Sequence, residues 1–214
     1  MSSPNWLVLL IGGPSGVGKS VVARQLGRQF SISWLQVDDV RLAFQRSHVT
    51  LPEKTSELYF FEETPHIWRL PPERLRDGLI AVGQIMMPAL EIVIENHVDT
   101  LAPIIIEGDG ILPALLARPA VRDRAIDGQM RAIFLIESEE SAMLANIEVR
   151  RQGISDDVMW RRGNPEQTGE EVRTEARAKW LYGQWLADEA RRQGLPVLEP
   201  RPWSTLIQRM MESF

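Results

Sequence analysis

The residues with the clearest chemical potential lie near the start of the chain. Residues 12–20 fit the pattern G-x-x-x-x-G-K-[ST], with its fixed places at Gly13, Gly18, Lys19 and Ser20. In such a loop the backbone N–H groups wrap a phosphate chain, the lysine reaches the β- and γ-phosphates, and the hydroxyl ligates Mg²⁺. The pattern therefore predicts a site for ATP and Mg²⁺. We expect the nucleotide to contact the loop residues Gly13, Pro14, Ser15, Gly16, Val17, Gly18, Lys19, Ser20 and Val21.

The flanks of this loop have the periodicity that the chemistry requires. An apolar run of strand length, residues 6–11, enters the loop, and Val22, Leu26 and Phe30 follow it at helical spacing. A helix that begins at the loop directs the positive end of its dipole toward the phosphates. Because the pattern and its flanks agree independently, a glycine-rich turn that contains Lys-Ser by chance is the less favoured interpretation.

A second group of polar residues follows the second predicted strand, residues 33–37. In open parallel sheets, ligands bind beyond the carboxyl ends of the strands, so Asp38, Asp39 and Arg41 should face the loop. Asp38 could accept the proton of a substrate hydroxyl, and Arg41 could hold an anionic substrate. The alternatives are that Asp38 is a solvated side chain and that Asp39 is mainly the N-cap of a helix over residues 40–46.

The third predicted strand, residues 103–108, ends in Glu107 and is followed by Asp109-Gly110. Glu107 is a candidate for a contact to Mg²⁺ through water, so Ser20 and Glu107 form the expected metal site. Asp109 is a candidate substrate contact, because glycines on both sides let a ligand approach the backbone closely. An ordinary Gly-Asp-Gly turn is the alternative.

Four arginines, Arg150, Arg151, Arg161 and Arg162, border or lie within the polar, turn-rich residues 153–167. Phosphoryl transfer spreads negative charge over several oxygens, which mobile arginines can stabilise when a lid closes. We expect residues 153–167 to form this lid, with Arg150 and Arg161 as the catalytic candidates. Surface arginines at helix ends are the alternative.

Strands alternate with helices along the chain, which predicts an α/β fold with a mostly parallel sheet. Further strands are expected over residues 130–136 and 195–198, and helices over residues 72–97, 138–152, 168–193 and from 202 onward. Ser138 is the expected N-cap of one helix, and Thr168 with Glu171 predicts a capping box on another. Residues 44–100 contain an aromatic cluster and are the expected acceptor-binding segment.

Composition limits the remaining possibilities. A length of 214 residues fits a single domain over residues 1–214, and 44% apolar residues suffice for a core. The absence of cysteine excludes disulfides and thiolate metal sites and suits a cytoplasmic location. We expect no membrane partner, because we see no apolar run close to the roughly 18 residues of a membrane span. A net charge of −5 argues against a nucleic-acid partner.

Taken together, these residues make the chain resemble a P-loop kinase of the nucleoside-kinase-like group. The element Asp38-x-x-Arg41 is similar to the acid-x-x-Arg element of adenylylsulfate kinases, chloramphenicol phosphotransferases, zeta-toxin kinases and polynucleotide 5′-kinases. The phosphate loop, residues 103–108 and Pro113 are similar to those of 2-phosphoglycerate kinases. The chain departs from that family at Asp109-Gly110, where an apolar residue and a histidine are usual, and this leaves the substrate open.

The resemblance implies a three-layer P-loop NTPase sandwich with helices on both faces of a five-stranded sheet of order 2-3-1-4-5. It implies a lid after the helix that follows the fourth strand. It also implies that Asp38 is a base or substrate anchor, with Arg41 as its partner.

The favoured function is an ATP-dependent kinase that transfers the γ-phosphate to a hydroxyl of a small-molecule acceptor. One alternative is a polynucleotide 5′-hydroxyl kinase, which requires a basic channel beside Asp38. Another is a nucleotide-binding regulatory switch without transfer activity, for which Asp38 would be dispensable. The sequence leaves the acceptor and the oligomeric state open.

Overall fold

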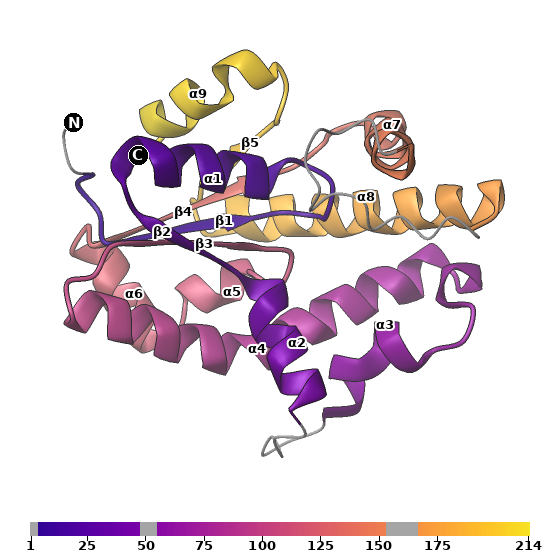
Figure 1. The fold of residues 1–214 in the computed structure, drawn as a ribbon, viewed down its shortest axis with the longest axis horizontal. Coiled ribbons are helices and arrows are strands. Elements are labelled where there is room, and N and C mark those ends of the chain that lie inside the picture. Colours follow the sequence, from indigo (N-terminus) through magenta and orange to yellow (C-terminus); the bar gives the residue numbers. More distant parts are fainter. Residues whose placement is uncertain (1–3, 48–54, 153–166) are drawn as a thin grey trace.

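The computed structural model describes residues 4–47, 55–152 and 167–214 and is organised around one five-stranded sheet (Figure 1). The strand order is β2-β3-β1-β4-β5, and all the described pairings are parallel. This topology confirms the predicted fold class. The strands are β1 (Val8–Gly12), β2 (Ser33–Gln36), β3 (Ile104–Gly108), β4 (Met130–Leu135) and β5 (Val197–Leu198).

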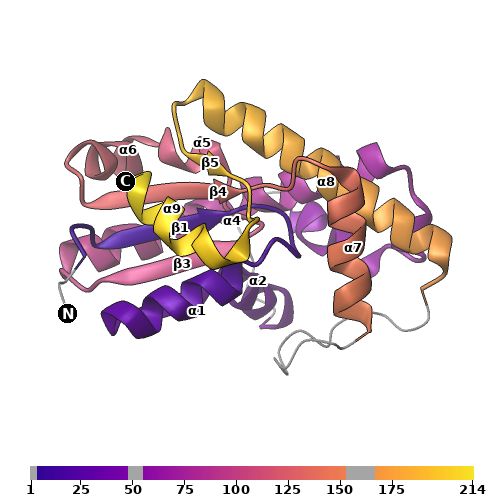
Figure 2. The same ribbon diagram turned by 90° about the horizontal axis from the view of Figure 1, so that it is seen from above.

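Helices cover both faces of the sheet, with α1 and α9 on one side and α4, α5 and α6 on the other (Figures 1 and 2). The helices are α1 (Lys19–Phe30), α2 (Val37–Arg46), α3 (Phe60–Glu63), α4 (Pro72–Asp99), α5 (Pro113–Leu116), α6 (Pro119–Ile126), α7 (Glu140–Arg151), α8 (Gly169–Arg192) and α9 (Leu206–Glu212). Short 3₁₀ turns are η1 (Thr55–Tyr59), η2 (Ile67–Arg69) and η4 (Trp203–Thr205).

The central strand β1 is buried on both faces, as its continuous apolar sequence requires. Its Leu9 and Ile11 belong to the core beneath α1 and α9, whereas Val8 and Leu10 belong to the core beneath α4. This alternation follows from the two-residue period of a strand. Each apolar layer is therefore anchored on the strand that leads into the phosphate loop.

The start of α2 differs from the prediction. The last register pair of β2 is Gln36 with Glu107, and the helix begins at Val37, three residues earlier than expected. Gln36 occupies the N-cap without a side-chain capping bond, so the interpretation of Asp39 as the N-cap is wrong. A physical reason is the close packing of Val37 on Gly108, where a Cβ added to the glycine would lie 2.6 Å from the Val37 Cβ.

Two further expectations about helices need correction. Helix α7 begins after Glu139, and no side chain caps it, so Ser138 is not its N-cap. Helix α4 is long and apolar enough, by length and composition alone, to cross a membrane, which the inspection for apolar runs missed. In the structure its Leu75, Val82 and Met86 are buried.

Thr168 and Glu171 form the predicted capping box at the start of α8. The Glu171 N–H donates to the Thr168 hydroxyl at 3.2 Å, and the Thr168 N–H donates to the Glu171 carboxylate at 2.9 Å. Each bond satisfies a backbone donor that the helix itself leaves unpaired. Most of the expected lid, residues 153–166, lies outside the described residues and so cannot be placed relative to α8.

Replacing Thr168 with alanine should lower the free energy of unfolding by about 1 kcal/mol, because the cap oxygen is lost. Thr168→Ser keeps that oxygen and serves as the control. Urea unfolding of the two variants and the wild type measures the difference. Equal stability of Thr168→Ala and the wild type would contradict a stabilising cap.

Candidate active site

The loop between β1 and α1 depends on glycine at two positions. Gly13 has φ 138°, and a Cβ there would lie 2.2 Å from the carbonyl oxygen of Leu135. Gly18 has φ 84°, and its Cβ would lie 2.3 Å from the ring of Trp203. The loop therefore combines a backbone that non-glycine residues rarely adopt with contacts that leave no room for a side chain.

Two of the predicted site residues, Lys19 and Ser20, lie at the start of α1. The Lys19 ammonium is buried and donates to the Pro14 carbonyl oxygen at 2.9 Å across the loop. The Ser20 hydroxyl donates to the Glu107 carboxylate at 2.5 Å. The structure thus brings the predicted metal pair, Ser20 and Glu107, into direct contact beside Lys19.

Glu107 is 3% exposed, and its burial raises the pKa of its carboxyl. The positive charge of Lys19 and the hydrogen bond from Ser20 act in the opposite direction and lower this pKa. The carboxylate is therefore held at the loop against an unfavourable desolvation, which is a common condition of functional acids.

The donor set fits a Mg²⁺ ion bound together with phosphates. Within the described ranges, no three His, Cys, Asp or Glu side chains gather as a metal-binding group. Mg²⁺ does not need such a cage, because it keeps several waters and takes one or two protein oxygens plus substrate phosphates. The Ser20 hydroxyl would be the direct ligand, and Glu107 would hold a bound water.

Asp38 lies in the first turn of α2 and pairs with Arg41, whose Nη2 is 2.9 Å from its carboxylate. The nearby negative charge of Asp109 is the main cause of a raised pKa at Asp38, followed by burial. Arg41 and Lys19 lower the same pKa. The parallel pairing of Gln36 with Glu107 places the ends of β2 and β3 beside one another, as the parallel sheet predicts.

Arg150 lies at the end of α7 and reaches the phosphate loop from the opposite side. Its Nη1 donates to the Ser15 hydroxyl at 2.9 Å. The other candidate from the expected lid, Arg161, lies outside the described residues. Arg151 donates to the Gln167 carbonyl oxygen at 2.9 Å, so it connects α7 to the segment that enters α8.

These groups line one cavity of about 760 Å³. Four of its lining residues, Trp34, Gln36, Leu42 and Gly108, were not predicted as site residues, and Asp39 was expected mainly as an N-cap. Trp34 and Gln36 are two apart on β2, a spacing that puts them on one face and could have suggested a shared role. The cavity is lined by Ser15, Gly16, Gly18, Lys19, Ser20, Trp34, Gln36, Asp38, Asp39, Arg41, Leu42, Glu107, Gly108, Asp109 and Arg150.

Four of the residues that were predicted to contact the nucleotide do not line this cavity. Gly13, Pro14, Val17 and Val21 are not among the lining residues. Val17 is fully buried in the core, and Val21 is 38% exposed on α1. Among the described residues of 44–100, none lines this cavity. The described aromatics there pack against one another, as in the edge-to-face pair Phe60 and Phe61 with 5.0 Å between ring centroids.

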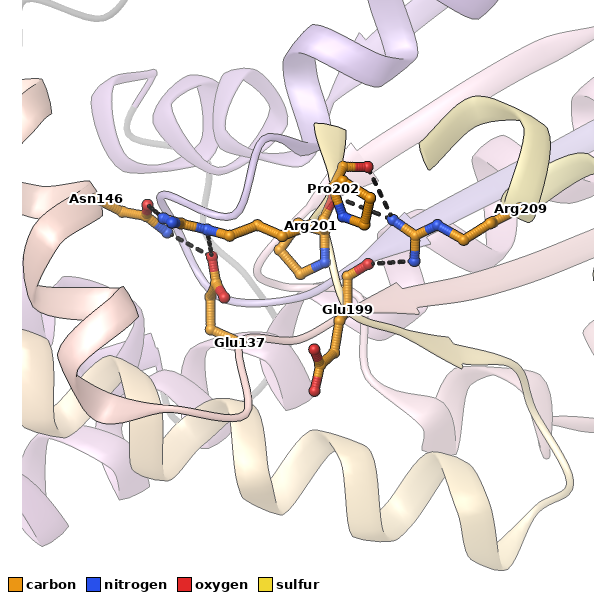
Figure 3. A network of polar contacts seen from close by, with 7 residues as sticks. Glu137, Asn146, Glu199, Arg201, Pro202 and Arg209 are labelled. Carbon is orange, nitrogen blue, oxygen red and sulfur yellow. Dashed lines mark hydrogen bonds and ion pairs between the residues drawn. The ribbon is translucent and has the colours of Figure 1, made fainter. Parts of the chain in front are cut away.

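A polar network that was not predicted supports the loop from the C-terminal side (Figure 3). Arg201 bonds to the Asn146 side-chain oxygen at 2.6 Å and pairs with Glu137 at 3.5 Å. Asn146 also donates to Glu137 at 2.8 Å. Arg209 donates to the carbonyl oxygens of Glu199 and Pro202. The segment in which Trp203 packs against Gly18 is therefore hydrogen-bonded or ion-paired to Glu137 after β4, to α7 and to α9.

No protein-family model matches this sequence, and no curated protein matches it. Solved structures are similar at low identity. A shikimate kinase from Aquifex aeolicus is 13% identical, with 96% of this chain and 95% of that chain covered and a TM-score of 0.43. A gluconokinase from Sinorhizobium meliloti is 12% identical, with 96% and 90% covered and a TM-score of 0.45.

A deoxyadenosine kinase from M. mycoides is 13% identical, with 96% of this chain and 97% of that chain covered and a TM-score of 0.43. All three are named as kinases. At these identities and scores the similarities are too distant to specify a function. The function therefore has to be argued from the residues of the site.

The raised pKa of Glu107 makes a prediction about stability. A carboxyl whose pKa is higher in the folded than in the unfolded protein opposes folding when it is ionised. Glu107→Gln should therefore raise the free energy of unfolding at pH 7. The gain should shrink as the pH falls through the raised pKa toward the ordinary value of 4.5. Thermal unfolding between pH 4.5 and 7.5 measures it.

The matched control is Glu148→Gln, which changes an exposed acid on α7. Its effect on stability should be small and nearly independent of pH. If Glu107→Gln destabilises the protein at pH 7, then the hydrogen bond from Ser20 and the attraction to Lys19 outweigh the cost of burial.

Proposed function

We propose that this protein is an ATP-dependent phosphotransferase that moves the γ-phosphate of ATP to a hydroxyl of a small molecule. The observation that carries the proposal is the contact of Ser20 with Glu107 beside the buried Lys19, in a cavity that also contains Asp38. A phosphate loop alone would fit any nucleotide-binding protein. Transfer to an alcohol also needs a group that accepts the hydroxyl proton, and an acid in the same cavity can do this.

Each residue then has a defined task in the transfer. The loop backbone and Lys19 hold the phosphate chain, and Arg150 adds positive charge near Ser15. The acceptor oxygen forms a bond to the γ-phosphorus while the bond to the β–γ bridging oxygen breaks, so ADP leaves with that oxygen. The hydroxyl proton passes to Asp38. Mg²⁺, when bound, supplies charge neutralisation on the phosphates.

The electrostatic surroundings of Asp38 suit a base. A base works best when its pKa lies near the operating pH, and the charge of Asp109 raises the pKa of Asp38 in that direction. Arg41 opposes this effect and orients the carboxylate through the 2.9 Å ion pair. A nucleotide-binding switch without transfer activity needs no such acid. We further propose a cytoplasmic location, which the absence of cysteine suits.

Lys19→Ala should abolish most transfer and weaken ATP binding, because the variant lacks the point charge near the β- and γ-phosphates. Calorimetric titration with Mg²⁺·ATP and an ATP-consumption assay measure the two effects. Arg192→Ala, which changes a cation on the far end of α8, is the control and should match the wild type. Unchanged turnover in the folded Lys19→Ala variant would overturn the nucleotide assignment.

Asp38→Asn tests the transfer step itself. The variant keeps the size of the side chain but loses the charge that accepts the proton. Transfer should fall by roughly 10²–10⁴-fold, while the affinity for Mg²⁺·ATP should stay within about threefold of the wild type. Without a known acceptor, slow ATP hydrolysis is the readout.

The control for this variant is Asp39→Asn. Asp39 is exposed in the first turn of α2, so its replacement should reduce transfer far less. If neither variant affects turnover, a regulatory switch becomes the better description. If Asp39 is essential and Asp38 is dispensable, then the neighbouring carboxylate is the base.

A further inference from the structure

The charges that line the cavity are unevenly distributed between its two parts. Lys19 and Arg150 lie at the phosphate loop, where they face the expected nucleotide. Beyond the ends of β2 and β3, the lining includes the carboxylates of Asp38, Asp39 and Asp109 but only one described cation, Arg41. This second part, which we name the acceptor side, is where a hydroxyl compound would have to meet Asp38.

Arg41 does not reverse this excess of negative charge, because it is already paired with Asp38 at 2.9 Å. An anionic acceptor would therefore meet Asp39 and Asp109 with little uncompensated positive charge among the described lining residues. Like charges brought together in a partly dehydrated site carry a large energetic cost.

The wall of the acceptor side adds a second observation. Trp34 and Gln36 of β2 and Leu42 of α2 are half-buried and line the same cavity. An indole face accommodates both a sugar-like ring and a cation, which it attracts through its quadrupole. The Gln36 amide can donate to or accept from hydroxyl groups. An aromatic and amide wall beside three carboxylates favours a polar cation over an anion.

We propose that the acceptor is a hydroxyl compound that also carries an amino group, such as an amino sugar or an amino alcohol, with its ammonium bound by Asp109. This inference rests on the proposed function, because it assumes that the cavity receives a phosphate acceptor. Asp38 remains the proton acceptor.

The electrostatics of the two carboxylates agree with this assignment. Asp38 and Asp109 line the same cavity, and the negative charge of Asp109 is the main cause of the raised pKa of Asp38. A bound ammonium would relieve this repulsion between the two carboxylates.

The backbone that carries Asp109 is held independently of its carboxylate. The hydroxyl of the fully buried Tyr182 on α8 donates to the Asp109 carbonyl oxygen. Replacing the Asp109 side chain with an amide therefore leaves this support in place, which makes Asp109→Asn a suitable probe of charge alone.

The test compares acceptors that differ mainly in charge. Glucosamine, glucose and glucuronate form one series, and 3-amino-1,2-propanediol, glycerol and glycerate form another. Binding of each compound to the full chain with Mg²⁺·ADP is measured by calorimetry, and ADP release from ATP is measured alongside. The amine of at least one series should bind about tenfold more tightly than its neutral analogue. The anion should bind most weakly.

Asp109→Asn should reduce the preference for the amine to within about threefold of the neutral analogue, with the affinity for Mg²⁺·ATP unchanged. Asp188→Asn, which removes an exposed acid on α8 outside the cavity lining, should keep the full preference. The inference is overturned if the anion binds best, if no amine is preferred, or if Asp109→Asn keeps the preference. Failure to bind Mg²⁺·ATP would instead refute the proposed function.

Discussion

The hydrogen bond between Ser20 and Glu107 is the interaction on which the arrangement of the site depends. It joins the first turn of α1 to the end of β3, two segments separated by 87 positions in the sequence. The parallel register makes this contact possible, because Ile11 lies opposite Glu107 and Gly12 lies opposite Gly108. Both strands therefore end at the same level, and the acid of one meets the loop of the other.

The energetic cost of burying Glu107 explains why a cation and a hydrogen-bond donor lie next to it. A carboxylate that is 3% exposed needs a positive charge and a hydrogen-bond donor nearby, and Lys19 and Ser20 supply both. The proposed function assigns the same two residues to the phosphate chain and the metal. Structural and catalytic demands would then fall on one set of side chains, so a change at either residue is expected to alter stability and function together.

Helix α8 supports two parts of the site from adjacent residues. The Tyr182 hydroxyl holds the Asp109 carbonyl oxygen, and Gly183 packs so closely on Pro14 that a Cβ would lie 2.9 Å from its ring. The phosphate loop and the turn after β3 therefore both contact helix α8. A shift of α8 would move both, which couples the nucleotide side of the cavity to the acceptor side.

The parts of the structure that could be predicted are those that local patterns specify. The loop motif, the alternation of strands and helices and the Thr168 capping box all follow from neighbouring residues. The start of α2 could not be predicted in this way, because Val37 enters the helix while it packs on Gly108, 71 positions further along the chain. Propensity alone favoured Asp39 as the cap, and tertiary packing prevailed over it.

The same limit applies to the site. The proximity of Lys19, Ser20 and Glu107 could be predicted because the ends of adjacent parallel strands meet at one edge of the sheet. Arg201 could not be connected to Glu137 and Asn146 from the sequence, since they lie in the segment after β5, the segment after β4 and α7, and their contact depends on how these pack. Trp34 was also missed as a lining residue, because a tryptophan in a strand is more often a core residue than part of a cavity wall.

The early start of α2 has a consequence for the chemistry of Asp38. The first turn of a helix favours negative charge, so the position of Asp38 stabilises its ionised form, as does Arg41 one turn later. Asp109 opposes both effects from the end of β3. The protonation of Asp38 therefore depends on a balance in which Asp109 and burial raise its pKa, while Arg41 and Lys19 lower it. A ligand that neutralised Asp109 would shift this balance toward the ionised form of Asp38.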